Sequence, residues 1–114
     1  MNHVMKLRPT YFDMIADGTK IYEIRLNDEK RQLVQVGDII TFQREPELEQ
    51  TCTTIVTELL HFDTFNQMAS KLPLAKVGFA NMTPAEVVEI YHQFYTPENE
   101  QKYGVLAIKV ENIK

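Results

Sequence analysis

The sequence has few of the residues that support covalent cross-links, metal centres or nucleophilic catalysis. Cys52 is the single cysteine, so no intrachain disulfide can form, and a reducing compartment, the cytoplasm, is the simplest expectation. The three histidines share no ligand spacing, so no metal or other cofactor is expected. Ser70, the only serine, lies in a predicted amphipathic helix, and Cys52 has no base nearby in sequence. Both are interpreted as structural residues.

Glycine-rich loops and long apolar runs are also missing. The four glycines are scattered along the sequence, so a glycine-rich phosphate loop is excluded. No apolar stretch approaches the ~20 residues that span a bilayer, and no charged leader followed by an apolar segment opens the sequence. We therefore expect neither secretion nor a membrane partner.

Charge is modest in amount and uneven in its distribution. The 114 residues suit a single domain over 1–114. The 12 basic and 16 acidic side chains give a net charge of −4, which argues against nucleic-acid binding by bulk electrostatics. Residues 1–44 nevertheless hold seven basic and six acidic side chains, including every arginine. An anionic ligand should meet this half, although ordinary solvated charges would give the same counts.

Hydrophobic periodicity and turn residues predict an α+β fold with about five strands and about three helices. The strands are expected at 3–7, 21–26, 39–43, 51–60 and 106–110, and the helices from 9 to Gly18, from 64 to 72, and from 83 to just before Pro97. Segments 27–32, 45–50 and 73–81 are expected to be loops. This pattern favours a small mixed barrel flanked by helices.

The third helix has the clearest start. Thr83 as N-cap, Pro84 at the first helical position and Glu86 three residues after the cap form a capping box. The apolar residues that follow share one helix face, and we interpret this stripe as core and not as a cofactor site; it comprises Val87, Ile90, Tyr91, Phe94 and Tyr95.

One stretch, Gly18-Thr-Lys20-Ile-Tyr-Glu23-Ile-Arg25, gathers three ionisable residues just past a helix-stopping glycine. Glu23 and Arg25 lie two apart on a predicted strand, so they share a face with Cα atoms roughly 6–7 Å apart. Lys20 lies at the helix-to-strand junction, where parity does not fix its direction. Converging on one hollow, these groups could bind a nucleobase or phosphate. The alternative is a surface ion pair on an edge strand, worth about 0–1 kcal/mol.

The stretch fits Gly-x-Lys-x-x-Glu-x-Arg and resembles the signature of the ASCH domain family, small PUA-like β-barrels associated with RNA. The predicted order of elements resembles the family over nearly the whole chain. The resemblance implies a cleft lined by Lys20, Glu23 and Arg25, to which we add Arg8 because it precedes the first helix, a natural anion site. It implies RNA, a nucleotide or a modified nucleoside as partner, and it leaves the oligomeric state open.

Some small bacterial ASCH proteins act as amidohydrolases on N4-acetylcytidine, and this sequence departs from their pattern. Glu23 replaces a threonine three residues after the motif lysine, and Ala80 replaces a glutamate before Asn-Met-Thr. A binding module is therefore the leading hypothesis. The alternative is a hydrolase on an acylated or modified nucleoside, with Lys20 as nucleophile or base and Glu23 as its proton partner. A protein-interaction role for the aromatic stripe is a third possibility.

Overall fold

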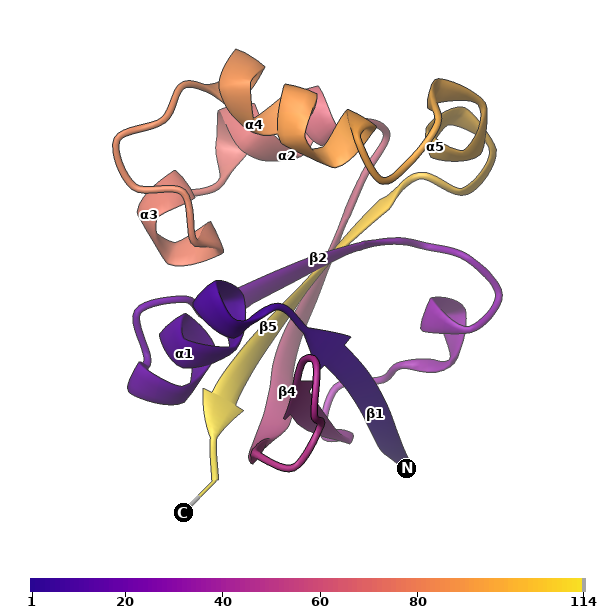
Figure 1. Cartoon of the computed structure of the whole chain (residues 1–114). Coiled ribbons are helices and arrows are strands. Elements are labelled where there is room, and N and C mark those ends of the chain that lie inside the picture. Colours follow the sequence, from indigo (N-terminus) through magenta and orange to yellow (C-terminus); the bar gives the residue numbers. More distant parts are fainter. Residues whose placement is uncertain (114) are drawn as a thin grey trace.

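One curled five-stranded sheet organises the computed structural model of the chain, which describes residues 1–113 (Figure 1). The strand order is β1-β3-β4-β5-β2, with β1 parallel to β3 and the other pairs antiparallel. The predicted α+β class with a mixed sheet is confirmed, and each predicted strand is present with ends shifted by two residues at most. The strands are β1 (Asn2–Leu7), β2 (Tyr22–Leu26), β3 (Ile39–Arg44), β4 (Thr51–Phe62) and β5 (Val105–Asn112).

Five α-helices accompany the sheet, two more than the sequence analysis expected. They are α1 (Pro9–Asp17), α2 (Phe65–Lys71), α3 (Leu74–Val77), α4 (Pro84–His92) and α5 (Pro97–Tyr103), and a 3-10 turn covers Arg31–Leu33. The short α3 lies inside the segment 73–81 that was expected to be a loop. Pro97 was interpreted as a stop signal, but it is the first residue of α5, with Thr96 as N-cap accepting from the Asn99 N–H at 3.2 Å.

The predicted capping chemistry is present at the helix starts. The Thr83 hydroxyl accepts from the Glu86 N–H at 3.2 Å, and the Glu86 carboxylate accepts from the Thr83 N–H at 2.9 Å. Helix α1 begins with Pro9 and ends at Gly18, whose φ of 85° is the left-handed conformation that glycine adopts without steric cost. These local signals fix where α1 and α4 begin.

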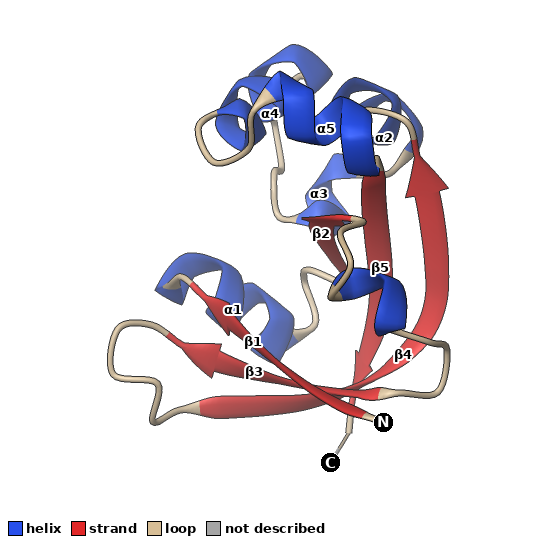
Figure 2. Ribbon diagram, turned by 90° about the vertical axis from the view of Figure 1, so that its right-hand side faces the viewer, coloured by secondary structure: helices blue, strands red, loops and turns tan. Residues whose placement is uncertain are grey.

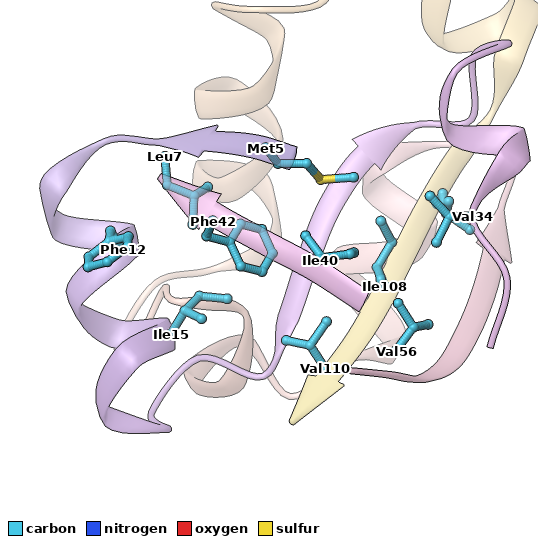
Figure 3. Close-up of a cluster of buried hydrophobic side chains, with 11 residues drawn as sticks. Met5, Leu7, Phe12, Ile15, Val34, Ile40, Phe42, Val56, Ile108 and Val110 are labelled. Carbon is cyan, nitrogen blue, oxygen red and sulfur yellow. The ribbon is translucent and has the colours of Figure 1, made fainter. Parts of the chain in front are cut away.

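Two hydrophobic clusters lie on opposite faces of β5, which alternates between them. Ile108 and Val110 pack into the cluster beneath α1 (Figure 3), and Leu106 belongs to the same cluster. Val105 and Ala107 pack into the second cluster, beneath α2 and α4. Because both faces of β5 are covered, this strand is buried along most of its length.

The sheet curls into a half-barrel whose edge strands are β1 and β2. Figure 2 shows α2, α4 and α5 gathered at one end of the long strands β4 and β5, with α1 toward the other end. The Arg25 side chain of β2 reaches β1, where its Nη2 donates to the Lys6 carbonyl at 3.0 Å. The motif therefore lies where the two sheet edges approach each other. Over residues 1–113, no helix has the length and apolar composition needed to cross a membrane.

Candidate functional site

The backbone between α1 and β2 places Lys20 beneath α3. After Gly18 the chain turns back, with the Lys20 N–H donating to the Met14 carbonyl at 3.0 Å. The Ile21 N–H then donates to the Lys76 carbonyl at 2.8 Å, which ties this junction to α3. The direction of Lys20, which strand parity left open, is set by these tertiary contacts.

Lys20 is a buried ammonium group with an acceptor for each of its N–H bonds. Its side chain is 2% exposed. Nζ donates to the carbonyls of Tyr22 and, at 2.7 Å, Val77, and it lies 3.3 Å from Glu23 Oε1. Burial lowers the pKa of Lys20, and the neighbouring Glu23 carboxylate opposes that shift. Two carbonyls and one carboxylate are the partners that a protonated lysine needs.

Glu23 joins Lys20 to Arg25. Its Oε2 accepts from Arg25 Nε at 2.7 Å, while its Oε1 faces Lys20. Burial alone would raise the pKa of Glu23, but the two cations outweigh it and hold that pKa below its ordinary value. Burial likewise opposes the charge of Arg25, yet the Glu23 carboxylate raises the pKa of the guanidinium. These three residues, called here the motif network, carry a net charge of +1 when all three are ionised.

The motif network lies in the wall of a cavity of about 360 Å³, called here the motif pocket. The sequence analysis singled out Arg8, Lys20, Glu23 and Arg25, and all four line this cavity. Its lining also includes β1, α1 and α4 and comprises Lys6, Leu7, Arg8, Tyr11, Lys20, Glu23, Ile24, Arg25, Glu45, Phe79, Ile90, Tyr91, Phe94 and Tyr95. The sequence motif therefore converges on one hollow and is not spread over a flat exterior.

Aromatic rings form much of the remaining wall, and they brace one another. Phe79 makes edge contacts with Tyr11 and Tyr91, each with ring centroids 5.7 Å apart. Tyr91 stacks at 4.7 Å on Phe65, which is fully buried. This chain of contacts couples the pocket wall to the second hydrophobic cluster, so the wall is held in place before any ligand arrives.

The interpretation of the α4 stripe as core holds for four of its five residues and is wrong for Phe94. Only Val87 is fully buried. Ile90, Tyr91 and Tyr95 pack on the second cluster and also line the motif pocket, while Phe94 is 50% exposed. The physical reason is that α4 ends at His92, so Phe94 lies beyond the helix and outside its buried face. The one signal in the sequence was the hydroxyl of each tyrosine, which needs water or a polar partner.

The tyrosine hydroxyls are available to a ligand. Over residues 1–113, the hydroxyls of Tyr11, Tyr91 and Tyr95 have no hydrogen-bond partner. Burial raises the pKa of Tyr91 well above its ordinary value of 10, and the Glu23 carboxylate adds to the shift. Burial also raises the pKa values of Tyr11 and Tyr95. The wall therefore presents neutral phenols that can either donate or accept.

Lys20 and Glu23 line the motif pocket, but the other residues considered for catalysis, Ala80, Ser70 and Cys52, do not. Ala80 and Ser70 are exposed, and neither lines the motif pocket. The Cys52 thiol donates to the Asn112 side-chain oxygen at 3.2 Å, and burial raises its pKa. Within residues 1–113, no three His, Cys, Asp or Glu side chains come together in an arrangement that could hold a metal ion.

A second cavity, of about 720 Å³, lies between α5 and the ends of β4 and β5. The buried Glu100 lines it, but this carboxylate accepts from the Phe65 N–H at 2.7 Å and contacts His92 Nε2 at 2.8 Å. It thus joins α5 to α2 and α4. None of the motif residues lines this cavity.

Comparisons with known proteins agree with the geometry. The protein PH0355, seen in a crystal structure, is similar to this chain at 35% identity, covering 99% of this chain and 100% of that one, with a TM-score of 0.88. The protein PF0455 from Pyrococcus furiosus, a solution NMR structure, is 31% identical over 100% of this chain and 99% of that one, with a TM-score of 0.80. The ASCH protein of Zymomonas mobilis shares the fold, with a TM-score of 0.66 at 14% identity over 95% of this chain and 65% of that one.

No curated protein matches the sequence. The family model described as the ASCH domain matches residues 5–114, which is nearly the whole chain and includes every residue of the motif network. With the motif, the half-barrel and this match in agreement, the chain belongs to the ASCH domain family.

Proposed function

We propose that this protein binds one nucleotide, free or within RNA, in the motif pocket. The observation that carries the proposal is a cavity of about 360 Å³ that combines a partly buried, oriented guanidinium with several aromatic rings. Unstacked nucleobases are recognised in this way, by stacking on aromatic side chains and by hydrogen bonds to their edges. The family resemblance to RNA-associated domains points to the same class of ligand.

The polar groups that remain free suit a ligand rich in acceptors. Arg25 uses Nε for Glu23 and Nη2 for the Lys6 carbonyl, and over residues 1–113 its Nη1 donates to no protein group. Those N–H bonds can reach a base carbonyl, a ring nitrogen or a phosphate oxygen. Glu23 has a positioning role here, because both of its oxygens face cations and fix the plane of Arg25.

The charge of the pocket favours a nucleotide over a neutral nucleoside. The lining holds four basic side chains, Lys6, Arg8, Lys20 and Arg25, and two acidic ones, Glu23 and Glu45, which gives 4 − 2 = +2. The whole chain carries −4. A positive cleft on an acidic protein focuses anions locally, while the rest of the surface repels a long polyanion.

Binding is favoured over hydrolysis by the state of Lys20. Three protein acceptors surround Nζ and suit the ammonium form, which has no lone pair to present to a substrate. Glu23 is held by two cations, and the exposed Ala80 supplies no acid or base at the position of the hydrolases' glutamate. A hydrolase would need a free amine and a group to receive or return the proton.

The test is calorimetric titration with the four ribonucleoside monophosphates, N4-acetylcytidine and a short RNA at low salt. Wild type should bind at least one of the phosphorylated ligands, and Arg25→Ala should weaken that binding about tenfold or more, the range expected for a lost specific base or phosphate contact. Arg44→Ala is the matched control, because Arg44 pairs with the exposed Asp13 and lies outside the pocket. Absence of binding to every ligand, or equal losses in both variants, would contradict the proposal.

The same samples distinguish binding from turnover. Incubation with N4-acetylcytidine followed by chromatography should leave the nucleoside intact. Release of acetate that Lys20→Ala abolishes would replace the binding proposal with the hydrolase. Thermal unfolding of each variant checks whether its fold is retained.

A further inference from the structure

Phe94 lies at the rim of the motif pocket and is not needed by the core. It sits in the segment between α4 and α5, lines the pocket, and is 50% exposed. Neither buried hydrophobic cluster includes it. Phe94 is therefore a half-exposed aromatic residue at the cavity, where a base could stack on its ring.

Arg8 meets this ring from a different part of the fold. It immediately precedes α1, and its Cζ lies 4.5 Å from the centroid of the Phe94 ring. Over residues 1–113, the Arg8 side chain makes no hydrogen bond and no ion pair. A guanidinium that covers an aromatic face keeps its N–H bonds in its own plane, where they stay free for an anion. We call Arg8 and Phe94 the rim pair.

We propose that the rim pair binds a second nucleotide, so that the ligand is a single-stranded oligonucleotide and not an isolated nucleotide. This inference rests on the proposed function. A cavity of about 360 Å³ holds one base with its sugar, so a longer chain has to leave the pocket past the residues that line its rim. Arg8 and the exposed Lys6 then meet the connecting phosphate, and the ring of Phe94 meets the next base.

The two positions should differ in selectivity. The base inside the pocket meets the Arg25 donors and the tyrosine hydroxyls, which distinguish one base edge from another. The base at the rim meets an aromatic face, and stacking is tolerant of sequence because every base has a π-face. The expected pattern is a preference for one base followed or preceded by any base.

The experiment measures how much affinity the second nucleotide adds. Calorimetry first compares the 3′- and 5′-monophosphates of the four ribonucleosides, and then the dinucleotides that contain the tightest-binding base. The variants are Phe94→Ala, Phe94→Tyr, which retains stacking, and Leu33→Ala. Leu33 is the matched control because it is 59% exposed and lies outside the pocket.

Wild type should bind the best dinucleotide about tenfold more tightly than the best monophosphate, the gain expected for one stacked base. Phe94→Ala should reduce this ratio to about one. Phe94→Tyr and Leu33→Ala should keep the ratio. For the dinucleotide, Arg8→Ala should make the plot of log affinity against log salt less steep by about 0.7, the change expected when one phosphate contact on a single strand is lost.

Two results would overturn the inference and leave the proposed function intact. One is that the wild-type protein binds the dinucleotide no more tightly than the monophosphate. The other is that Phe94→Ala keeps the full gain in affinity of the dinucleotide over the monophosphate. If neither monophosphates nor dinucleotides bind, the proposed function itself fails, and the rim site fails with it.

Discussion

Replacing Glu23 by glutamine tests the central feature of the site, the buried motif network. Glutamine keeps the shape of the side chain but removes the single negative charge between Lys20, at 3.3 Å, and Arg25, at 2.7 Å. The variant leaves two cations side by side with side chains that are only 2% and 16% exposed. Because water cannot replace the lost carboxylate at Lys20, the cost should be that of an uncompensated buried charge.

The magnitude follows from burial and chain length. Removing one partner of a buried ion pair costs roughly 3–5 kcal/mol. For a chain of 114 residues each kcal/mol lowers Tm by about 4 °C. The Tm of Glu23→Gln should therefore fall by about 12–20 °C. Asp13→Asn is the matched control, since it breaks an ion pair with Arg44 whose carboxylate side chain is 61% exposed. That change should cost about 0–1 kcal/mol.

The pH dependence of the Glu23→Gln variant gives an independent check. Burial lowers the pKa of Lys20 and Glu23 raises it, so removing Glu23 moves the folded-state pKa further below its unfolded value of about 10.4. Between these two pKa values the unfolded chain binds more protons, so the stability of the variant should rise with pH. Adding Lys20→Met should remove this rise and recover part of the lost Tm.

Differential scanning fluorimetry across pH values, with circular dichroism for secondary structure, measures these effects. A Tm loss for Glu23→Gln no larger than that for Asp13→Asn would refute the reasoning. It would mean that water reaches the motif network freely, and the arguments for an oriented Arg25 would lose their basis.

Three further predictions concern the surroundings of the site. Gly78→Ala should lower the free energy of unfolding, measured by urea denaturation, by roughly 1–2 kcal/mol because the residue is left-handed, with φ of +105°. Crowding should add to this loss, since a Cβ would lie 3.3 Å from two side chains. Gly37→Ala, with φ of +93° and open space, should show the conformational cost alone. The pKa of the Asp38 carboxyl is lowered to about 2 by hydrogen bonds from His3, the Gln35 N–H and the N-terminal amino group, so it should titrate near that value by NMR. His3→Ala should shift the midpoint upward. Stability from this group is then present above about pH 4 and lost as pH falls through 2. Tyr91 should show no phenolate absorbance at pH 10, because burial raises its pKa; half ionisation there would contradict a desolvated wall.

The elements and the motif were predictable because their signals are local. Alternation of apolar residues identified β2 and β5, and the Thr83 capping box fixed the start of α4. The same chemistry, Thr96 followed by Pro97, was overlooked as a helix start because the proline was interpreted only as a terminator. The short α3 has too few residues to show helical periodicity.

Sequence also singled out the motif residues that line the pocket, but not the surfaces that complete it. The Tyr91 and Phe94 side chains were interpreted as core because they continue the apolar face of α4. Periodicity describes one helix and carries no information about which neighbour covers a given side. Whether a half-buried ring meets a core or a cavity is therefore decided by the packing of other elements.

By itself, the sequence determined a mixed α+β domain with an acid and two cations carried on one short segment, since strand parity and helix capping act between residues close in the chain. Only the tertiary structure decided that Lys20 turns inward. Its acceptor on Val77 lies 57 residues away, and the Lys6 carbonyl that meets Arg25 belongs to the opposite sheet edge. The curl of the sheet and the docking of α3 bring these groups together, and such contacts between distant segments exist only once the chain has folded.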